Sequence, residues 1–510
     1  MKIFKTDKMK HTIYSIALLA IAAMPLSSCD DLDQTPHIET TSESVYTSVE
    51  KYKSVLGQLY SVFSLNSGIS SNKGEGYMRC YFNLQEVCTD EIVYSWLNGD
   101  NLNDIHDMNW DSQDVWVADT YYWTYYSIAL CNEFLRNTQN IGSFSEADQK
   151  TINQYAAEAR FLRALSYWHV LDLFRKGAFV TENDPIGAYV PNVADATQLF
   201  NYIESELKEI SELMPSRTEQ EYGRAPRAAA WMLLARLYLN AITYGQAEHY
   251  TDCITYSQKV IDEGYSLHSN YAQLFNADND KRTDEIIFHL QSDATNHISW
   301  GVSSYIVCGC PSPSSSQNPA NYGVTSAWGM WRATSQAIAL FNDYPADVRN
   351  TFYTDGQTYP ITDTYDQSQG YFFEKWTNLT DDGLQASNTG DFGVNTDFPM
   401  FRTAEAYLNI AEAIVRGGTG ATLTADEAIN AIRQRAGIVN ISGATLTDVF
   451  NERSREFQLE CMRRTDLIRF GKFIIGGWDC GPKNKEEKYK YYPIPQTELT
   501  ANPNLTNEEY

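Results

Sequence analysis

The sequence predicts an all-α protein in which helical hairpins pack against a loop-rich region that carries the ligand site. Three observations predict this fold class. Apolar residues recur every three or four positions in several segments, helix-starting and helix-stopping residues flank those segments, and two long stretches rich in Gly, Ser, Pro, Asn and Asp interrupt them. With 510 residues, of which 43% are hydrophobic and 20% charged, the chain has ample apolar material for a core.

The N-terminus has the order of a secretory signal. A lysine-rich start precedes an apolar run over residues 13–26, which is shorter than the ~20 residues that a transmembrane helix needs. The run ends in Leu-Ser-Ser-Cys29, which is similar to the lipobox of bacterial lipoproteins, where the cysteine is acylated. An ordinary cleavage site beside an unrelated cysteine is the alternative. The expected divisions are a signal peptide (1–28), a lipid-anchored tether (29–45) and a single domain (46–510).

Helices are predicted most clearly in three places. Over residues 151–175, large apolar side chains from Phe161 to Phe174 recur every three or four positions. Residues 226–264 form a predicted hairpin that Pro226 opens at a favourable first-turn position.

Residues 402–437 form a second predicted hairpin, in which Thr424 and Glu427 have the spacing of a capping box. Hairpins of this length with small and aromatic residues at the seam are typical of tetratricopeptide-like repeats. An irregular all-α domain fits the same periodicity equally well.

Two stretches are predicted to be loop-rich, near residues 70–112 and 295–395. The second contains a run of Pro and Ser over residues 311–319. Because loops on a rigid scaffold commonly carry binding residues, we expect these two stretches to build the site.

The charge of the chain excludes some classes of partner. The net charge is −26, and it becomes −29 without the first 28 residues, which carry four lysines and one aspartate. Such an acidic protein repels nucleic acid, so a neutral or cationic ligand or a protein partner is expected. Tyrosines outnumber phenylalanines, 34 to 22, which suits a wet contact surface. The eight cysteines after Cys29 form no CxxC pair, and most are expected to be buried thiols.

Motifs of enzymes and metal sites are missing from the sequence. It contains no GxSxG, HExxH or Walker pattern, and the eight histidines are scattered. Carboxylate pairs are too frequent among 65 acidic residues to identify a glycosidase site. Asp278, Asn279 and Asp280 could supply oxygen ligands to a structural Ca²⁺, but a polar turn is the favoured interpretation. We expect no catalytic activity and no cofactor.

Four stretches of the chain resemble the SusD/RagB family, in the family's order. They are Cys29 with Leu32, Asp33 and Pro36; residues 158–174 (EARFLRALSYWHVLDLF); residues 398–413 (FPMFRTAEAYLNIAEA); and residues 452–460 with 464–472, 492–496 and 502–504. One departure is Cys461, where the family usually has Gly. The resemblance implies tetratricopeptide-like helices on a loop-rich region and a lipid anchor that holds the protein on the outer membrane. It also implies a partner, a TonB-dependent SusC-like barrel over which the protein closes.

The resemblance extends to the starch-binding branch of the family, in which aromatic rings cradle an α-glucan while an Arg and an Asn bond its hydroxyls. The residues that it implies are Arg79, Tyr94, Asn98, Tyr305 and Trp328. Tyr94 stands where that branch has Trp, and Asn98 is a neighbouring substitute because the matching position is Gly99.

We therefore expect non-catalytic capture of a polysaccharide, with an α-glucan such as starch favoured, and its delivery to the barrel. Another glycan such as dextran, or a peptide, is the alternative ligand. Tyr94 and Trp96 are two positions apart, so on an extended segment they would point the same way. Packing in the core is the alternative for each of them and for Trp328 and Trp331.

Overall fold

The computed structural model describes residues 45–64, 75–296, 301–387, 389, 393–482 and 484–508. The predicted signal peptide, Cys29 and most of the tether lie outside this range. Within it, no helix combines the length and the apolar character that crossing a membrane requires.

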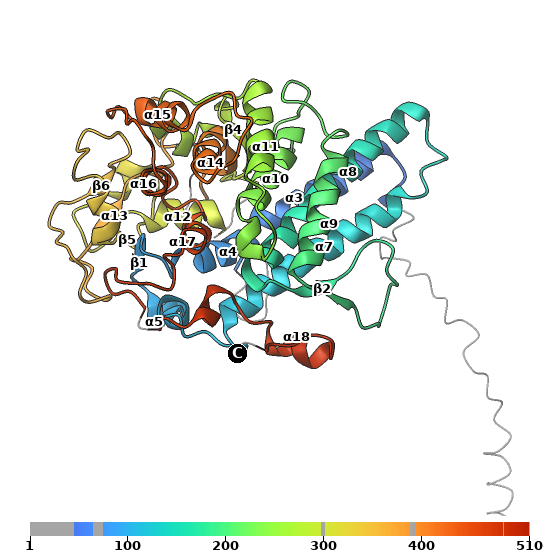
Figure 1. Ribbon diagram of the computed structural model, residues 1–510, viewed down its shortest axis with the longest axis horizontal. Helices are drawn as coiled ribbons and strands as arrows, with labels where there is room; N and C mark the ends of the chain where they lie inside the picture. Colours follow the sequence, from blue (N-terminus) through green and yellow to red (C-terminus); the bar gives the residue numbers. More distant parts are fainter. Residues whose placement is uncertain are drawn as a thin grey trace, which may run out of the picture. The chain divides into compact units, whose positions relative to one another are not determined.

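Helices dominate the first half of the described chain (Figure 1). They are α3 (Val49–Ser64), α4 (Tyr77–Glu86), α5 (Leu97–Asp100), α6 (Asn103–His106), α7 (Val115–Thr138), α8 (Glu146–Phe174), α9 (Ala196–Ile210), α10 (Arg227–Leu239) and α11 (Tyr250–Asp262). Helix α8 packs against both α7 and α9, and α10 packs against α11. The predicted helix over 151–175 and the predicted hairpin over 226–264 are therefore confirmed.

A second set of helices follows the loop-rich region. They are α12 (Val302–Gly309), α13 (Ser335–Ala339), α14 (Thr403–Val415), α15 (Ala425–Arg435), α16 (Leu446–Glu456), α17 (Arg463–Arg469) and α18 (Gln496–Ala501). The α14–α15 hairpin begins and ends as predicted. The Thr424 hydroxyl accepts from the Glu427 backbone N–H at 3.2 Å, and the Glu427 carboxylate accepts from the Thr424 backbone N–H at 2.8 Å, which completes the capping box.

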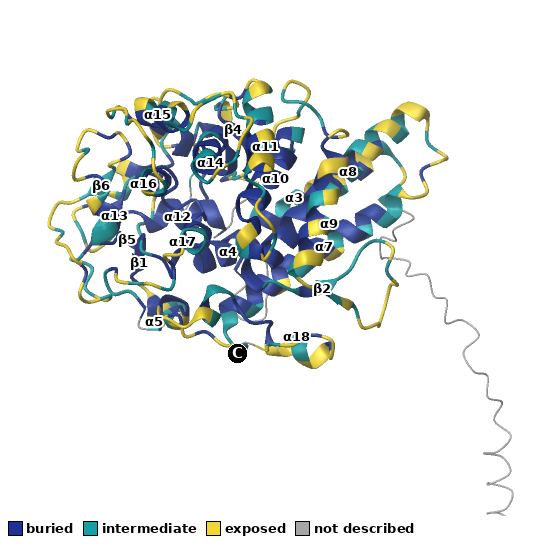
Figure 2. Ribbon diagram, in the orientation of Figure 1, coloured by how far each residue is buried: buried dark blue, intermediate teal, exposed yellow. Residues whose placement is uncertain are grey.

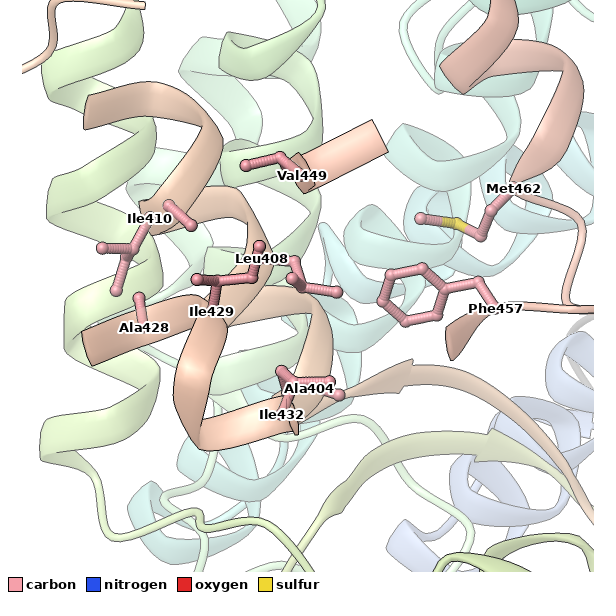
Figure 3. Packing of buried hydrophobic residues seen from close by; sticks show 10 residues of the cluster. Ala404, Leu408, Ile410, Ala428, Ile429, Ile432, Val449, Phe457 and Met462 are labelled. Carbon is pink, nitrogen blue, oxygen red and sulfur yellow. The ribbon is translucent and has the colours of Figure 1, made fainter. Parts of the chain in front are cut away.

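Small side chains at the seam bring the C-terminal helices together (Figure 3). Ala404 and Ala411 on α14 and Ala428 on α15 are fully buried in one apolar cluster, and α14 packs against α15. Branched and aromatic side chains fill the remaining space: Leu408, Ile410, Ile429, Ile432, Val449, Phe457 and Met462. The helical scaffold thus continues from α10 and α11 into α14 and α15, since α11 packs against α14.

Helix α8 is buried on all sides over its C-terminal half (Figure 2). An all-round buried helix must pair its polar groups inside the protein. Glu158 accordingly pairs with Arg224, and Arg163 pairs with Glu182. This requirement accounts for the charged residues inside the stretch that resembles the family's most recognisable helix.

The two predicted loop-rich stretches are joined by a small sheet. Its strands are β1 (Ile92–Tyr94), β5 (Trp331–Ala333), β6 (Phe352–Tyr353) and β7 (Tyr371–Phe373), and they lie in the antiparallel order β1-β5-β7-β6. Strand β1 comes from the first stretch and the others come from the second. The sheet therefore fixes both stretches relative to each other on one side of the helices (Figure 1).

Two further antiparallel pairs complete the described strands. They are β2 (Gly177–Phe179) with β3 (Asn192–Ala194), and β4 (Ile286–Leu290) with β8 (Phe398–Arg402). All eight cysteines after Cys29 are unpaired thiols, and seven of them are buried, with Cys480 partly exposed. The expectation of mostly buried thiols is confirmed.

Candidate functional site

The pairing of β1 with β5 brings predicted site residues from both stretches to one place. Tyr94 lies opposite Trp331, and beyond this pair the Ser95 backbone N–H donates to the Met330 carbonyl at 3.0 Å. In an antiparallel pair, the residues that continue past the last bonded pair stay side by side. Trp96 therefore leaves the sheet next to the segment that carries Trp328.

The segment around Trp328 is also fastened to the end of α12. The backbone N–H of Trp328 donates to the Cys308 carbonyl at 2.8 Å, and that of Met330 donates to the Gly309 carbonyl at 2.7 Å. Gly309 has to be glycine at this contact, because a Cβ there would collide with the Trp331 indole. Since Tyr305 lies on α12, this contact places Tyr305 beside Trp331.

Trp331 is the centre of a buried aromatic cluster. Its ring centroid lies 5.0 Å from that of Phe82, 5.0 Å from that of Tyr94 and 4.8 Å from that of Tyr305, and its indole N–H donates to the Tyr305 carbonyl at 3.3 Å. Aromatic pairs at such separations stabilise a fold beyond the area that they bury. The sequence left open whether Trp331 contacts a ligand or packs in the core, and the structure places Trp331 in the core. It is in fact the strand residue that holds the predicted site together.

Arg79 lies against the same cluster, in the first turn of α4. Its guanidinium carbon is 4.0 Å from the centroid of the Tyr305 ring, and it pairs with Glu75 at 2.7 Å and with Asp100 at 4.0 Å. The Tyr94 hydroxyl donates to the same Asp100 carboxylate. Burial raises the pKa of both Tyr94 and Tyr305, so both remain neutral.

The structure thus brings Arg79, Tyr94 and Tyr305 together but does not present them to solvent. Tyr94 and Tyr305 are 0% exposed and Arg79 is 5% exposed. The expectation that these two rings offer a face for stacking is not met, because packing around Trp331 uses their surfaces. Tyr94 and Trp96 nevertheless differ in their surroundings, because Trp96 is 40% exposed while Tyr94 is fully buried, and the chain leaves the extended conformation after Trp96, where φ is −110° and ψ is 33°.

The accessible layer over this cluster has different members. Trp96 is 40% exposed, Trp328 is partly exposed, and Asn98 is exposed on the short helix α5. Indoles offer apolar faces and a carboxamide offers hydrogen-bonding groups, which are the groups that a glycan site requires. The sequence indicated Trp96 as an aromatic near the site, but only its position in the structure separates it from Tyr94.

The proposed Ca²⁺ ligands are engaged in protein contacts. Asp278 pairs with Lys281 at 2.8 Å, and the buried Asn279 amide donates to the carbonyls of Leu274 (3.0 Å) and Asp397 (2.9 Å). These contacts are those of a polar turn. In the part of the chain that the structure describes, no group of three or more His, Cys, Asp and Glu side chains could hold a metal ion.

A separate polar cluster lies near this turn. The His289 ring stacks on Tyr222 with centroids 4.3 Å apart, its Nε2 is 3.5 Å from the Asp397 carboxylate, and the Tyr222 hydroxyl donates to that carboxylate. Burial lowers the pKa of His289 to about 4 and raises that of Asp397 to about 7. At neutral pH the histidine is therefore uncharged.

Comparison with known proteins identifies the family of this chain. The model of the SusD family matches residues 244–510, and a model described as "Starch-binding associating with outer membrane" matches residues 31–239. The chain is 31% identical to the starch-binding protein SusD of Bacteroides thetaiotaomicron, over 99% of each chain. It is 24% identical to SusD-like protein P25 of Formosa agariphila, over 98% of each.

A solved structure shares the fold. Surface glycan-binding protein A from Bacteroides thetaiotaomicron, in complex with laminarihexaose, superposes with a TM-score of 0.74 at 20% identity, covering 91% of this chain and 100% of that one. Together with the family models, which account for almost all of the described residues, these relatives show that the chain belongs to the SusD family.

Proposed function

We propose that this protein binds a neutral polysaccharide or oligosaccharide at the cell surface without cleaving it. The observation that carries the proposal is the accessible layer of Trp96, Asn98 and Trp328 on a buried aromatic cluster. A sugar ring exposes C–H groups on its face and hydroxyls at its edge. The indoles would cover the face, and the Asn98 carboxamide would bond hydroxyls that otherwise lose their partners at ~1–3 kcal/mol each.

In this proposal the predicted residues have two roles. Trp328 and Asn98 contact the glycan, and Trp96 joins them because it is the half-exposed ring next to Asn98. Arg79, Tyr94 and Tyr305 hold these contacts in place from below. Their buried positions support a positioning role rather than direct stacking.

An α-glucan such as starch is the favoured ligand. The relative that binds starch aligns over 99% of both chains. A β-glucan such as laminarin is the second ligand class to test, because a protein of the same fold was solved with laminarihexaose. Dextran and peptides complete the set of alternatives.

The test is isothermal titration calorimetry of the protein without its leader against amylopectin, dextran, laminarin and a peptide pool. Trp96 is 40% exposed, so a sugar covering half of that area hides ~50 Å² and contributes ~1.3 kcal/mol, roughly tenfold in Kd. We expect Trp96→Ala and Trp328→Ala each to weaken binding by about tenfold. Glycan binding that neither substitution changes would place the site elsewhere, and binding to the peptide pool alone would refute the proposed ligand class.

Absence of catalysis is part of the same proposal. Purified protein incubated with the glycan that it binds should release no reducing ends above the level of a heat-treated sample. Release that scales with protein concentration would show an enzyme.

The position on the cell is proposed from the sequence. Residues 1–28 would be removed, and Cys29 would be acylated and hold the protein on the outer membrane. A palmitate analogue should label the wild type and leave Cys29→Ala unlabelled; equal labelling of both would refute the anchor.

Delivery to a TonB-dependent SusC-like barrel is the remaining part of the proposal. Affinity purification of the tagged, anchored protein from detergent-solubilised outer membranes should recover such a barrel. Recovery of the protein alone would contradict this partner.

A further inference from the structure

A second half-exposed ring lies beside the accessible layer, on the loop between β6 and β7. Tyr365 is 52% exposed, and its hydroxyl donates to the Asn103 Oδ1 at 3.3 Å. The Asn103 Nδ2 in turn donates to the Asn98 Oδ1 at 2.7 Å. A row of polar contacts therefore connects Tyr365 to Asn98, a member of the proposed site.

One buried guanidinium holds this loop and the site segment together. Arg332 on β5 is 0% exposed, and its Nε donates to the Ser95 hydroxyl at 3.0 Å. The other nitrogens donate to three loop carbonyls, those of Thr364, Asp366 (2.7 Å) and Gln369 (2.8 Å). Arg332 thus bonds the residue just before Trp96 and the residues on both sides of Tyr365.

Arg332 is unusual among the buried arginines of this protein. Among the residues that the structure describes, no carboxylate lies within ion-pair distance of Arg332. Its four hydrogen bonds go to three backbone carbonyls and one hydroxyl. Burying a cation without an opposite charge is costly. Its contacts all serve to set the loop against the Trp96 segment.

The loop is also ordered from within. The Tyr365 backbone N–H donates to the Asp363 carboxylate at 2.9 Å, and the Gln369 side-chain oxygen accepts from the backbone N–H groups of Thr362 (2.7 Å) and Asp363 (3.1 Å). The exposed ring of Tyr365 is therefore held in place before any ligand arrives. Such pre-organisation reduces the conformational entropy that the loop loses when a ligand binds.

We propose that Tyr365 and Asn103 form a second glycan subsite, so that the protein binds a chain of several sugars rather than a single terminal unit. This inference rests on the proposed function. The Tyr365 ring would cover the face of a sugar further along the chain, while its hydroxyl oxygen can still accept a hydrogen bond. The Asn98 Nδ2, which bonds to no described residue, can donate to a hydroxyl between the two rings.

The experiment compares ligand lengths. Wild type, Trp96→Ala, Tyr365→Ala and Tyr365→Phe are titrated with the trisaccharide and the heptasaccharide of the glycan that the wild type binds best. Tyr189→Ala is the matched control: Tyr189 is 36% exposed on the loop between β2 and β3, which lies at the other end of the view in Figure 1. Circular dichroism confirms that each variant is folded.

We expect Tyr365→Ala to weaken heptasaccharide binding by about tenfold, the effect of ~50 Å² of lost ring contact, and to leave trisaccharide binding within about twofold. Tyr365→Phe keeps the ring and should lose less than about threefold. Trp96→Ala should weaken both ligands, and Tyr189→Ala neither.

Two outcomes would overturn the subsite. Either Tyr365→Ala binds the heptasaccharide as tightly as the wild type, or it loses trisaccharide binding to the same extent, which would mean that the loop only supports the first subsite. If the wild type binds no glycan at all, the proposed function itself fails and the subsite fails with it.

Discussion

Replacing Glu456 by Gln should destabilise the protein strongly, because Glu456 is the shared anion of a buried charge network. Its carboxylate pairs with Arg349 at 3.0 Å, with Arg402 at 2.5 Å and with Arg435, and it is 0% exposed. The network connects α16 to the β8 strand and to the loop-rich region. The charged groups joined in it are Glu285, Asp347, Arg349, Lys375, Arg402, Arg433, Arg435, Glu452, Arg455, Glu456 and Glu460.

The expected loss follows from the balance of that network. Its six cations already exceed its five carboxylates, so removing one more negative charge leaves two buried cations uncompensated. Breaking a buried pair in this way costs about 3–5 kcal/mol. With a urea slope of about 3 kcal/mol/M, the unfolding midpoint should fall by about 1–1.7 M.

The assay is urea unfolding followed by circular dichroism at neutral pH, since urea does not screen ion pairs. The control is Glu209→Gln, whose partner Arg160 lies at 3.0 Å but whose side chain is 66% exposed, so it should cost less than about 1 kcal/mol. Equal midpoints for the two variants would refute the reasoning.

The pH dependence gives a second check on the same residue. Burial by itself would raise the pKa of Glu456, but Arg435, Arg402 and Arg349 hold that pKa well below its usual value. A lowered folded-state pKa stabilises the protein above the unfolded-state value of 4.5, and this contribution declines as the pH falls below it. The difference between wild type and Glu456→Gln should therefore shrink on acidification.

Three further predictions concern other parts of the molecule. Cys461 adopts φ of +61°, a backbone conformation that favours glycine. Cys461→Gly should therefore be more stable than Cys461→Ala by about 1 kcal/mol in urea unfolding, and the reverse order would contradict the strain. The pKa of Asp397 is raised to about 7 in the folded protein, so its contribution to stability is complete below pH 3.8 and is lost as the pH rises to about 7. The urea midpoint of Asp397→Asn should therefore fall less than that of the wild type between about pH 5 and pH 8. Equal falls would refute the raised pKa. In the native protein that lacks residues 1–29, a thiol reagent should modify only Cys480, and additional fast-reacting thiols would contradict the observed burial.

Local sequence rules predicted the scaffold well. The capping box at Thr424, the helix start after Pro226 and the hairpin breaks depend on residues within about four positions of one another. Periodicity also located the long helix α8, although it could not reveal that its C-terminal half is buried on every side. That property depends on α7, α9 and α3, which pack around it.

The ligand site itself stays a prediction, although the structure groups some of the residues proposed for it. Resemblance to the family identified Arg79, Tyr94 and Tyr305, and the structure brings these three residues together. The family resemblance could not distinguish a buried ring from an accessible one, because Tyr94 and Trp96 are both aromatic and lie two positions apart. Tyr365 carried no signal in the sequence, since a single tyrosine in a polar loop resembles any other exposed residue.

The sequence by itself determined the helical fold class, the hairpins and their caps, the SusD family resemblance, and the region in which a ligand site is expected. These features are encoded by neighbouring residues or by motifs that keep their order. The tertiary structure decided which rings face solvent, because that depends on pairing between Tyr94 and Trp331 and on the contacts of Arg332 with Ser95 and the 364–369 carbonyls. These contacts join distant segments of the chain: Ser95 and Arg332 are 237 positions apart. No local sequence pattern encodes them.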